Sequence, residues 1–118
     1  MDNKLFDSEL KLMEMIWQNE PVSAKQMSVL AEKSVGWNKN TTYTVLKKLI
    51  EKNVVLRTEP NFICTSLVKK EDVRKAETNT LISKLFNGSK KAFFSALLED
   101  ESLTEEELDE LRQMIEKR

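Results

Sequence analysis

The chain has 118 residues and nearly balanced charge, with 19 Lys and Arg against 20 Asp and Glu. Its single cysteine excludes an internal disulfide, and the lack of any histidine removes the commonest metal ligand and acid–base group. No apolar run approaches the roughly 20 residues of a membrane span, and the N-terminus lacks the apolar core of a signal peptide. We therefore expect a cytoplasmic protein with no metal, no other cofactor and no membrane insertion.

Charge is distributed unevenly along the chain. Residues 1–70 carry 11 Lys and Arg against 8 Asp and Glu, whereas residues 71–118 carry 8 against 12. Within residues 37–58, five cations accompany a single acid, Glu51. The local field decides whether a surface attracts a polyanion, so we expect any nucleic-acid site to lie in residues 37–58.

The first two predicted elements are helices. Between Asp7 and Gln18, spacings of three, three and one predict a helix with an apolar stripe, which ends before Pro21: Leu10, Met13, Ile16 and Trp17. A second helix is predicted from about Ala24 to Lys33. Ser23 and Gln26 mark its start with the spacing of a capping box, in which each side chain bonds the backbone N–H of the other residue.

A third helix is predicted from its N-cap Asn38 to about Lys52, after a turn at Gly36, where glycine tolerates a left-handed conformation. One face carries hydroxyl, amide and ammonium groups, and the face expected to pack inward comprises Thr42, Val45, Leu46, Leu49 and Ile50. A helix that reads DNA needs both faces. The apolar face packs on a core, while on the polar face short side chains contact base edges and cations contact phosphates. The predicted DNA contacts, with Tyr43 and Thr44 nearest the bases, are Lys39, Asn40, Thr41, Tyr43, Thr44, Lys47 and Lys48.

Two segments rich in β-branched and aromatic residues, 54–58 and 62–67, flank residues 59–61 and predict a β-hairpin. Arg57 and Asn61 lie on this hairpin and are weaker candidates for contacts to a DNA backbone. Cys64 lies on its second strand and is expected to be a small buried apolar residue rather than a redox sensor. Three helices followed by a hairpin is the order of a winged helix-turn-helix, so the predicted fold class is mainly α with a small β-hairpin.

The remaining sequence is predicted to be helical, with breaks at 87–89 and 99–101 and a second capping box, Thr104 with Glu107, at the start of the last helix. Three short apolar helices cannot readily bury themselves, whereas two interleaved copies can, so we expect a homodimer. The expected domains are a winged helix, residues 1–70, and a helical dimerisation domain, residues 71–118. The alternative is that these helices fold back onto the winged helix. The expected dimerisation residues are Leu81, Leu85, Phe93, Phe94, Leu97, Leu108, Leu111 and Ile115.

Residues 37–49 resemble the pattern W-x-x-x-T-[VI]-x-T-L-[LI]-x-R-L, and shorter matches lie at 10–17, 23–24, 65–68 and 107–112. In this order the matches resemble the penicillinase-repressor family of bacterial regulators (BlaI/MecI, with the copper-responsive CopY proteins as relatives) over nearly the whole chain. Thr41 and Thr44 fall on the two threonines of the family's recognition helix. Lys48 falls on its arginine, which keeps the charge without the bidentate geometry.

The resemblance implies a transcriptional repressor. Its winged helix would bind a dyad-symmetric operator in double-stranded DNA, its C-terminal helices would form the dimer, and the controlled genes would serve β-lactam resistance or the cell-wall stress response. In BlaI/MecI relatives, a membrane sensor protease leads to cleavage at an Asn-Phe bond before the last helix. Alignment puts Ala96 and Leu97 at that bond, so the family's Asn and Phe are absent, as are the paired C-x-C motifs of the copper-responsive relatives. One cut in this apolar segment, expected to join two dimerisation helices, would still destroy the dimer.

Two other function classes compete with the repressor. A winged helix need not bind DNA, and the near-zero net charge favours a protein–protein adaptor whose Phe93–Phe94 region docks a partner helix. An enzyme is disfavoured, because the chain has no histidine, no nucleophile elbow and no glycine-rich phosphate loop. Its acidic cluster at 105–110 is typical of a solvated helix face near a helix N-terminus.

Overall fold

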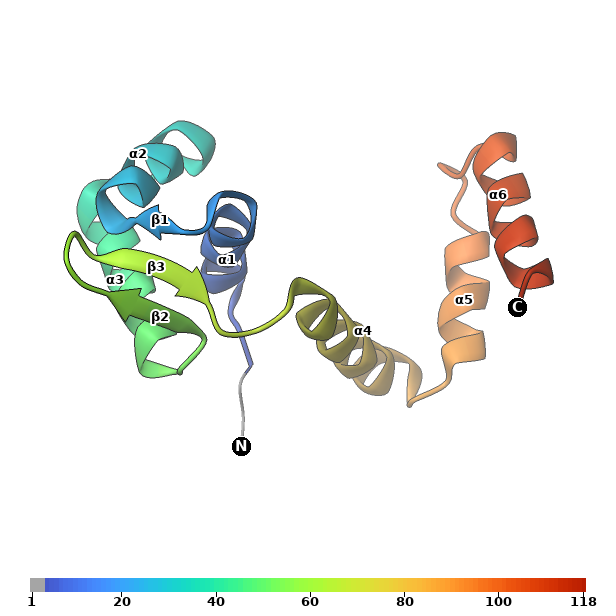
Figure 1. Cartoon of the computed structure of the whole chain (residues 1–118). Helices are drawn as coiled ribbons and strands as arrows, with labels where there is room; N and C mark the ends of the chain where they lie inside the picture. The colour runs from blue at the N-terminus through green and yellow to red at the C-terminus, as the bar shows by residue number, and fades with distance from the viewer. Residues whose placement is uncertain (1–3) are drawn as a thin grey trace. The chain divides into compact units, whose positions relative to one another are not determined.

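The computed structural model describes residues 4–118, which form six helices and three short strands (Figure 1). In chain order these are α1 Asp7–Asn19, β1 Val22–Ser23, α2 Ala24–Val35, α3 Lys39–Glu51, β2 Val55–Thr58, β3 Ile63–Ser66, α4 Lys70–Phe86, α5 Lys90–Leu98 and α6 Glu105–Glu116. The chain divides into two compact units, Met1–Val73 and Arg74–Arg118, so that the division falls inside α4. Within residues 4–118, no helix is both long enough and apolar enough to cross a membrane.

The core of the first unit lies between α1, α2 and α3. Its completely buried side chains include Leu12, Met13 and Ile16 from α1, Met27 and Ala31 from α2, and Leu46 and Leu49 from α3. The apolar face of α1 is broader than its predicted stripe. Leu12 and Met15 are buried, whereas Leu10 and Trp17, which were expected in the stripe, are half-buried at its margins. A helix that docks on a core buries a face at least 100° wide, which a single three-and-four stripe underestimates.

The predicted helix starts are confirmed in atomic detail. The Gln26 backbone N–H donates to Ser23 Oγ (3.1 Å), and the Ser23 N–H donates to Gln26 Oε1 (3.0 Å), which completes the capping box of α2. Thr104 and Glu107 repeat this arrangement at α6. The second helix continues two residues beyond its predicted end, and Gly36 stops it with φ of 72°.

The predicted hairpin is part of a three-stranded antiparallel sheet in the order β1-β3-β2. β1 was not predicted, because two residues are too few to show the alternation that marks a strand. It pairs Val22 with Cys64, which lies on the central strand and is completely buried. Burial raises the pKa of the Cys64 thiol to about 11, so the thiol is protonated at neutral pH. The prediction that Cys64 is a small buried apolar residue is confirmed.

The second unit leaves most of its apolar side chains uncovered. In α4, Ile82 is buried, and the Phe86 ring meets the Phe93 ring of α5 edge to face with centroids 5.6 Å apart. Of the eight residues expected at a dimer interface, none is buried within the chain. Four of them are half-buried: Phe93, Phe94, Leu108 and Leu111. The other four are exposed: Leu81, Leu85, Leu97 and Ile115.

The apolar segment at Ala96 and Leu97 is part of a helix rather than a connection between two helices. Ala96 and Leu97 lie in the last turn of α5, and not in the segment between α5 and α6, which covers residues 99–104. The apolar sequence around them is helical because Ser89 caps the start of α5, where its side chain accepts the Ala92 N–H (3.0 Å). An extended substrate backbone at this bond would require α5 to unwind at its end.

Replacing Ser23 by Ala should lower the free energy of unfolding by about 1 kcal/mol, because the Gln26 N–H loses its acceptor. Chemical denaturation followed by circular dichroism measures the change. Ser28→Ala is the matched control, because it removes a serine hydroxyl within α2 that donates to the Lys25 carbonyl (2.8 Å) and caps no helix start. It should alter the free energy of unfolding by less than about 0.5 kcal/mol. Equal losses in the two variants would contradict the capping role of Ser23.

Candidate nucleic-acid interface

The outward face of α3 is formed by one line of polar residues. Asn40, Thr44 and Lys47 follow each other at spacings of four and three, so they lie in a row on one side of the helix. All three are exposed, while the predicted inward residues Thr42 and Leu46 are completely buried. The structure therefore brings three of the predicted DNA contacts to the centre of a surface that the core leaves open.

The other predicted contacts flank this row. Lys48 and Thr41 are exposed along one side, and Tyr43 is half-buried along the other. Lys39 is exposed in the first turn of the helix. A helix that meets DNA along one line cannot present all seven predicted contacts equally. Lys39 and Thr41 therefore lie at the margin of the surface.

Hydrogen bonds at the start of α3 decide which polar groups remain available. The Asn38 side-chain oxygen accepts the Thr41 N–H (2.8 Å), so this amide caps the helix. Thr44 Oγ1 lies 2.8 Å from the Asn40 carbonyl and donates to it. The Thr44 oxygen keeps its capacity to accept a hydrogen bond, and its methyl group matches the methyl of a thymine.

Tyr43 joins α3 to the wing, the hairpin formed by β2 and β3. Its ring meets the ring of Phe62 edge to face, with centroids 6.0 Å apart and an interplanar angle of 86°. Lys39 Nζ lies 5.8 Å from the centroid of the same Tyr43 ring. The ring therefore fixes the wing beside α3 as well as bordering the row of polar residues, a role that the helical spacing alone did not reveal.

On the wing, Arg57 already has partners. Its guanidinium lies 3.7 Å from the centroid of the Phe62 ring, and its Nε pairs with Glu59 Oε2 at 2.5 Å. The Arg57 hydrogen bond holds the pKa of the Glu59 carboxyl below its usual value. Glu59 would therefore compete with a phosphate for the Arg57 guanidinium. Asn61 is exposed and takes φ of 74°, so it forms part of the wing turn.

Lys52, one of the five cations of residues 37–58, also has a structural role. Its Nζ lies 2.7 Å from Oε1 of the buried Glu9 on α1 and 2.9 Å from the Lys4 carbonyl. With Lys52 and Arg57 paired, the cations exposed on α3 are three lysines: Lys39, Lys47 and Lys48. The positive field over the helix is therefore weaker than the sequence count indicates.

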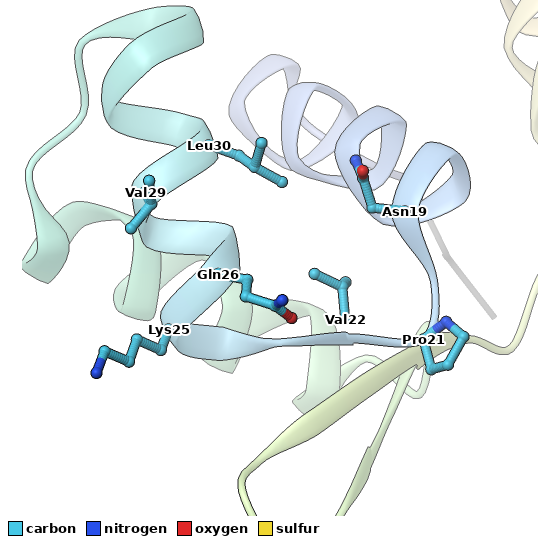
Figure 2. Close-up of a pocket in the computed structure, with 7 residues that line it drawn as sticks. All are labelled: Asn19, Pro21, Val22, Lys25, Gln26, Val29 and Leu30. Carbon is cyan, nitrogen blue, oxygen red and sulfur yellow. The ribbon is translucent and has the colours of Figure 1, made fainter.

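One further cation, Lys25, was not assigned from the sequence and is exposed in the first turn of α2. The capping box that marks this turn could have identified Lys25 from the sequence as a candidate for anion contact. A lysine directly after a helix start places a positive charge beside free backbone N–H groups. Figure 2 shows the Lys25 side chain pointing away from a shallow depression, which Val22 and Leu30 enter from β1 and α2. The depression has a volume of about 450 Å³, and its lining contains no carboxylate, hydroxyl or thiol that could support catalysis: Asn19, Pro21, Val22, Lys25, Gln26, Val29 and Leu30.

Comparison with known proteins identifies one family model and several relatives that match nearly the whole chain. A family model described as "Penicillinase repressor" matches residues 5–117. The methicillin resistance regulatory protein MecI of Staphylococcus aureus (strain N315) is 27% identical over 123 residues, which cover 100% of both chains. The penicillinase repressor of Bacillus licheniformis is 24% identical over 115 residues, covering 96% of this chain and 90% of that protein.

Two solved structures share the fold of the first unit. The solution structure of the DNA-binding domain of the repressor BlaI matches with a TM-score of 0.55 and 24% identity, over 58% of this chain and 87% of that one. The solution structure of monomeric Bacillus licheniformis BlaI in complex with the blaP half-operator matches with a TM-score of 0.53 and 24% identity, over the same 58% and 87%. These matches confirm the winged-helix fold.

Replacing Glu59 by Gln should strengthen binding to duplex DNA, because Arg57 loses the carboxylate that competes with a phosphate. Each additional phosphate contact should steepen the plot of log affinity against log salt by about 0.9. Fluorescence anisotropy titrations over a series of salt concentrations measure both quantities. The double variant Arg57→Ala, Glu59→Gln keeps the charge change at position 59 and should lose the steeper slope. A slope unaltered by Glu59→Gln would exclude Arg57 from the interface.

Proposed function

Because the chain belongs to the penicillinase-repressor family, we propose that it is a transcriptional repressor that binds a dyad-symmetric operator as a homodimer. The observation that carries the proposal is the exposed row Asn40, Thr44 and Lys47 on the second helix of a helix-turn-helix whose opposite face is buried. The second helix of this motif enters the major groove and meets base edges with its N-terminal residues. The relative BlaI, solved in complex with a half-operator, supports the same use of the fold here.

The residues of α3 divide between base and backbone contacts. Asn40 can pair with the N6 and N7 groups of adenine, and Thr44 can accept from a base amino group or contact a thymine methyl. Tyr43, held against the wing by Phe62, borders the same groove. Lys47 and Lys48 are long, flexible cations suited to phosphates, which fix the register of the helix on the duplex.

Dimerisation is the task of the second unit. One recognition helix reads too few base pairs for a specific site, and two related by a two-fold axis read half-sites about one helical turn apart. The exposed Leu81 and Leu85 lie four positions apart on α4, so they share a helix face that a second copy can cover. Phe93 and Phe94 on α5, and Leu108, Leu111 and Ile115 on α6, are the other residues proposed to meet the second copy.

The relatives also indicate what is controlled. MecI is named as a methicillin resistance regulator, and the other relatives as penicillinase repressors, so β-lactam resistance or cell-wall stress genes are the proposed targets. The proposed location is the cytoplasm, where the operator is accessible. A sensor protease is the proposed source of the inducing signal, with the end of α5 at Ala96 and Leu97 as the segment that would have to unwind for cleavage.

Selection of bound sites from a random duplex library tests the proposed function directly. Two identical half-sites of opposite direction should be enriched by the full chain, because a two-fold dimer places its α3 helices on two symmetric half-sites. Sequencing of the recovered DNA measures this enrichment. Recovery of no motif, together with capture of a defined protein partner on the Phe93–Phe94 surface, would favour the adaptor over the repressor.

Two substitutions on α3 should have distinguishable effects. Thr44→Ala should weaken binding to the selected operator by about 1–3 kcal/mol and leave a scrambled duplex unaffected, because it removes a base contact. Lys48→Ala should weaken binding to both duplexes and reduce the salt slope by about 1, because it removes a phosphate contact. Anisotropy titrations on both duplexes measure these changes. The exposed Thr78 and Lys11, on α4 and α1, give the matched controls Thr78→Ala and Lys11→Ala, and wild-type binding by all four variants would show that α3 is not the reading helix.

A further inference from the structure

Phe62, in the turn of the wing directly before β3, contacts both helices of the helix-turn-helix. Its ring meets the Tyr43 ring of α3 edge to face, with centroids 6.0 Å apart. Its carbonyl accepts the backbone N–H of Ala24, the first residue of α2 (2.9 Å). These residues all belong to the unit Met1–Val73. One residue of the wing therefore links the wing to α2 and α3.

The backbone conformation of Phe62 is unusual for a bulky residue. Its φ is 51°, in the left-handed region, and the preceding Asn61 has φ of 74°. Asparagine and glycine adopt this region readily, whereas phenylalanine does so at a cost. A glycine at position 62 would form the same turn with less strain. Because strain of this kind is kept where a side chain has a task, the conformation indicates that the Phe62 ring has a role beyond the turn.

The contacts on the wing restrain the Phe62 ring. The Arg57 guanidinium lies 3.7 Å from the ring centroid, an arrangement that the negative charge of an aromatic face favours. Glu59 holds both residues, because its Oε1 accepts the Phe62 N–H (3.3 Å) and its Oε2 pairs with Arg57 Nε. The Tyr43 ring therefore packs against a ring that cannot turn freely.

Tyr43 is a neighbour of the exposed row on α3. It lies three positions after Asn40 and four before Lys47, which places it beside both on the helix surface. Its ring is half-buried at the margin of the core. The contacts with Phe62 and with Lys39 Nζ involve the Tyr43 ring, so they leave the phenol hydroxyl able to donate to DNA or accept from it. The position of this hydroxyl depends on what holds the ring.

We propose that Phe62 is a positioning residue for operator recognition, which holds Tyr43 at the edge of the row Asn40, Thr44 and Lys47. This inference rests on the proposed function, because it assumes that the row reads DNA. Phe62 need not touch DNA itself. A side chain that is already held in place loses little conformational freedom on binding, so the contact made by Tyr43 strengthens recognition of the correct sequence at a lower entropic cost.

A double-mutant cycle between Tyr43 and Phe62 in the full chain tests this proposal. Anisotropy titrations compare the selected operator with a scrambled duplex. Phe62→Leu should weaken operator binding about three- to tenfold, the size of one aromatic pair contact, and leave the scrambled duplex unaffected. Tyr43→Leu should weaken operator binding at least as much. Because Phe62 acts through Tyr43, the double variant should bind the operator no more weakly than Tyr43→Leu alone.

Two further variants separate positioning from a general loss of structure. Phe62→Tyr keeps the ring and should restore operator affinity to the wild-type value. Phe6→Leu is the matched control, because it removes another ring of the same unit, which is exposed and has its centroid 4.7 Å from Lys52 Nζ. It should leave operator binding unchanged. Circular dichroism gives the unfolding midpoint of each variant, and Phe62→Met replaces Phe62→Leu in the cycle if the leucine lowers that midpoint.

The outcomes distinguish the role of Phe62 from the proposed function. The role of Phe62 would be overturned, with DNA binding intact, if the two losses multiplied in the double variant or if Phe62→Leu bound the operator like wild type. An equal loss on the scrambled duplex would overturn it as well. A wild type that selects no operator and binds no duplex would overturn the proposed function, and the role of Phe62 with it.

Discussion

The burial of one face of α3 against α1 and α2 is the constraint on which the other features of this molecule depend. Thr42, Leu46 and Leu49 must lie inward to close a small core, and the geometry of a helix then assigns the outward row without further choice. Gly36 ends α2 and Asn38 caps the start of α3, so the row begins at the first turn of α3. The row proposed to read DNA and the buried face thus lie on opposite sides of one helix, and neither can shift without the other.

The C-terminal end of α3 is held by an ion pair between its C-cap, Lys52, and the buried Glu9 of α1. Glu9 is only 1% exposed, and its Oε1 accepts the Phe6 N–H (2.8 Å) and pairs with Lys52 Nζ (2.7 Å). Glu9 Oε2 has no hydrogen-bond partner among the described residues. A buried carboxylate left without its cation is costly, so α1 and the end of α3 are tied together by an interaction that tolerates little displacement.

Sequence patterns predicted helices and caps well, because those signals are local. The capping boxes at Ser23 and Thr104 and the turn at Gly36 each depend on residues a few positions apart. The strand β1 was missed because its partner Cys64 lies far along the chain. The partners of the cations were missed for a similar reason, since only tertiary structure brings Glu9 to Lys52, and nothing in helical spacing relates Tyr43 to Phe62. The outward row on α3 could be predicted, whereas the strength of its field could not.

Lys52 pairs with Glu9, and Arg57 pairs with Glu59. These two ion pairs have a consequence for how such a repressor would search a genome. Counterion release by cations is what holds a protein on DNA of any sequence, and only three lysines of α3 are exposed. With so few exposed cations on this face, the protein would spend little time on the many competing nonspecific sites that otherwise sequester a regulator. A small number of molecules could then keep an operator occupied, and occupancy would respond quickly when that number falls.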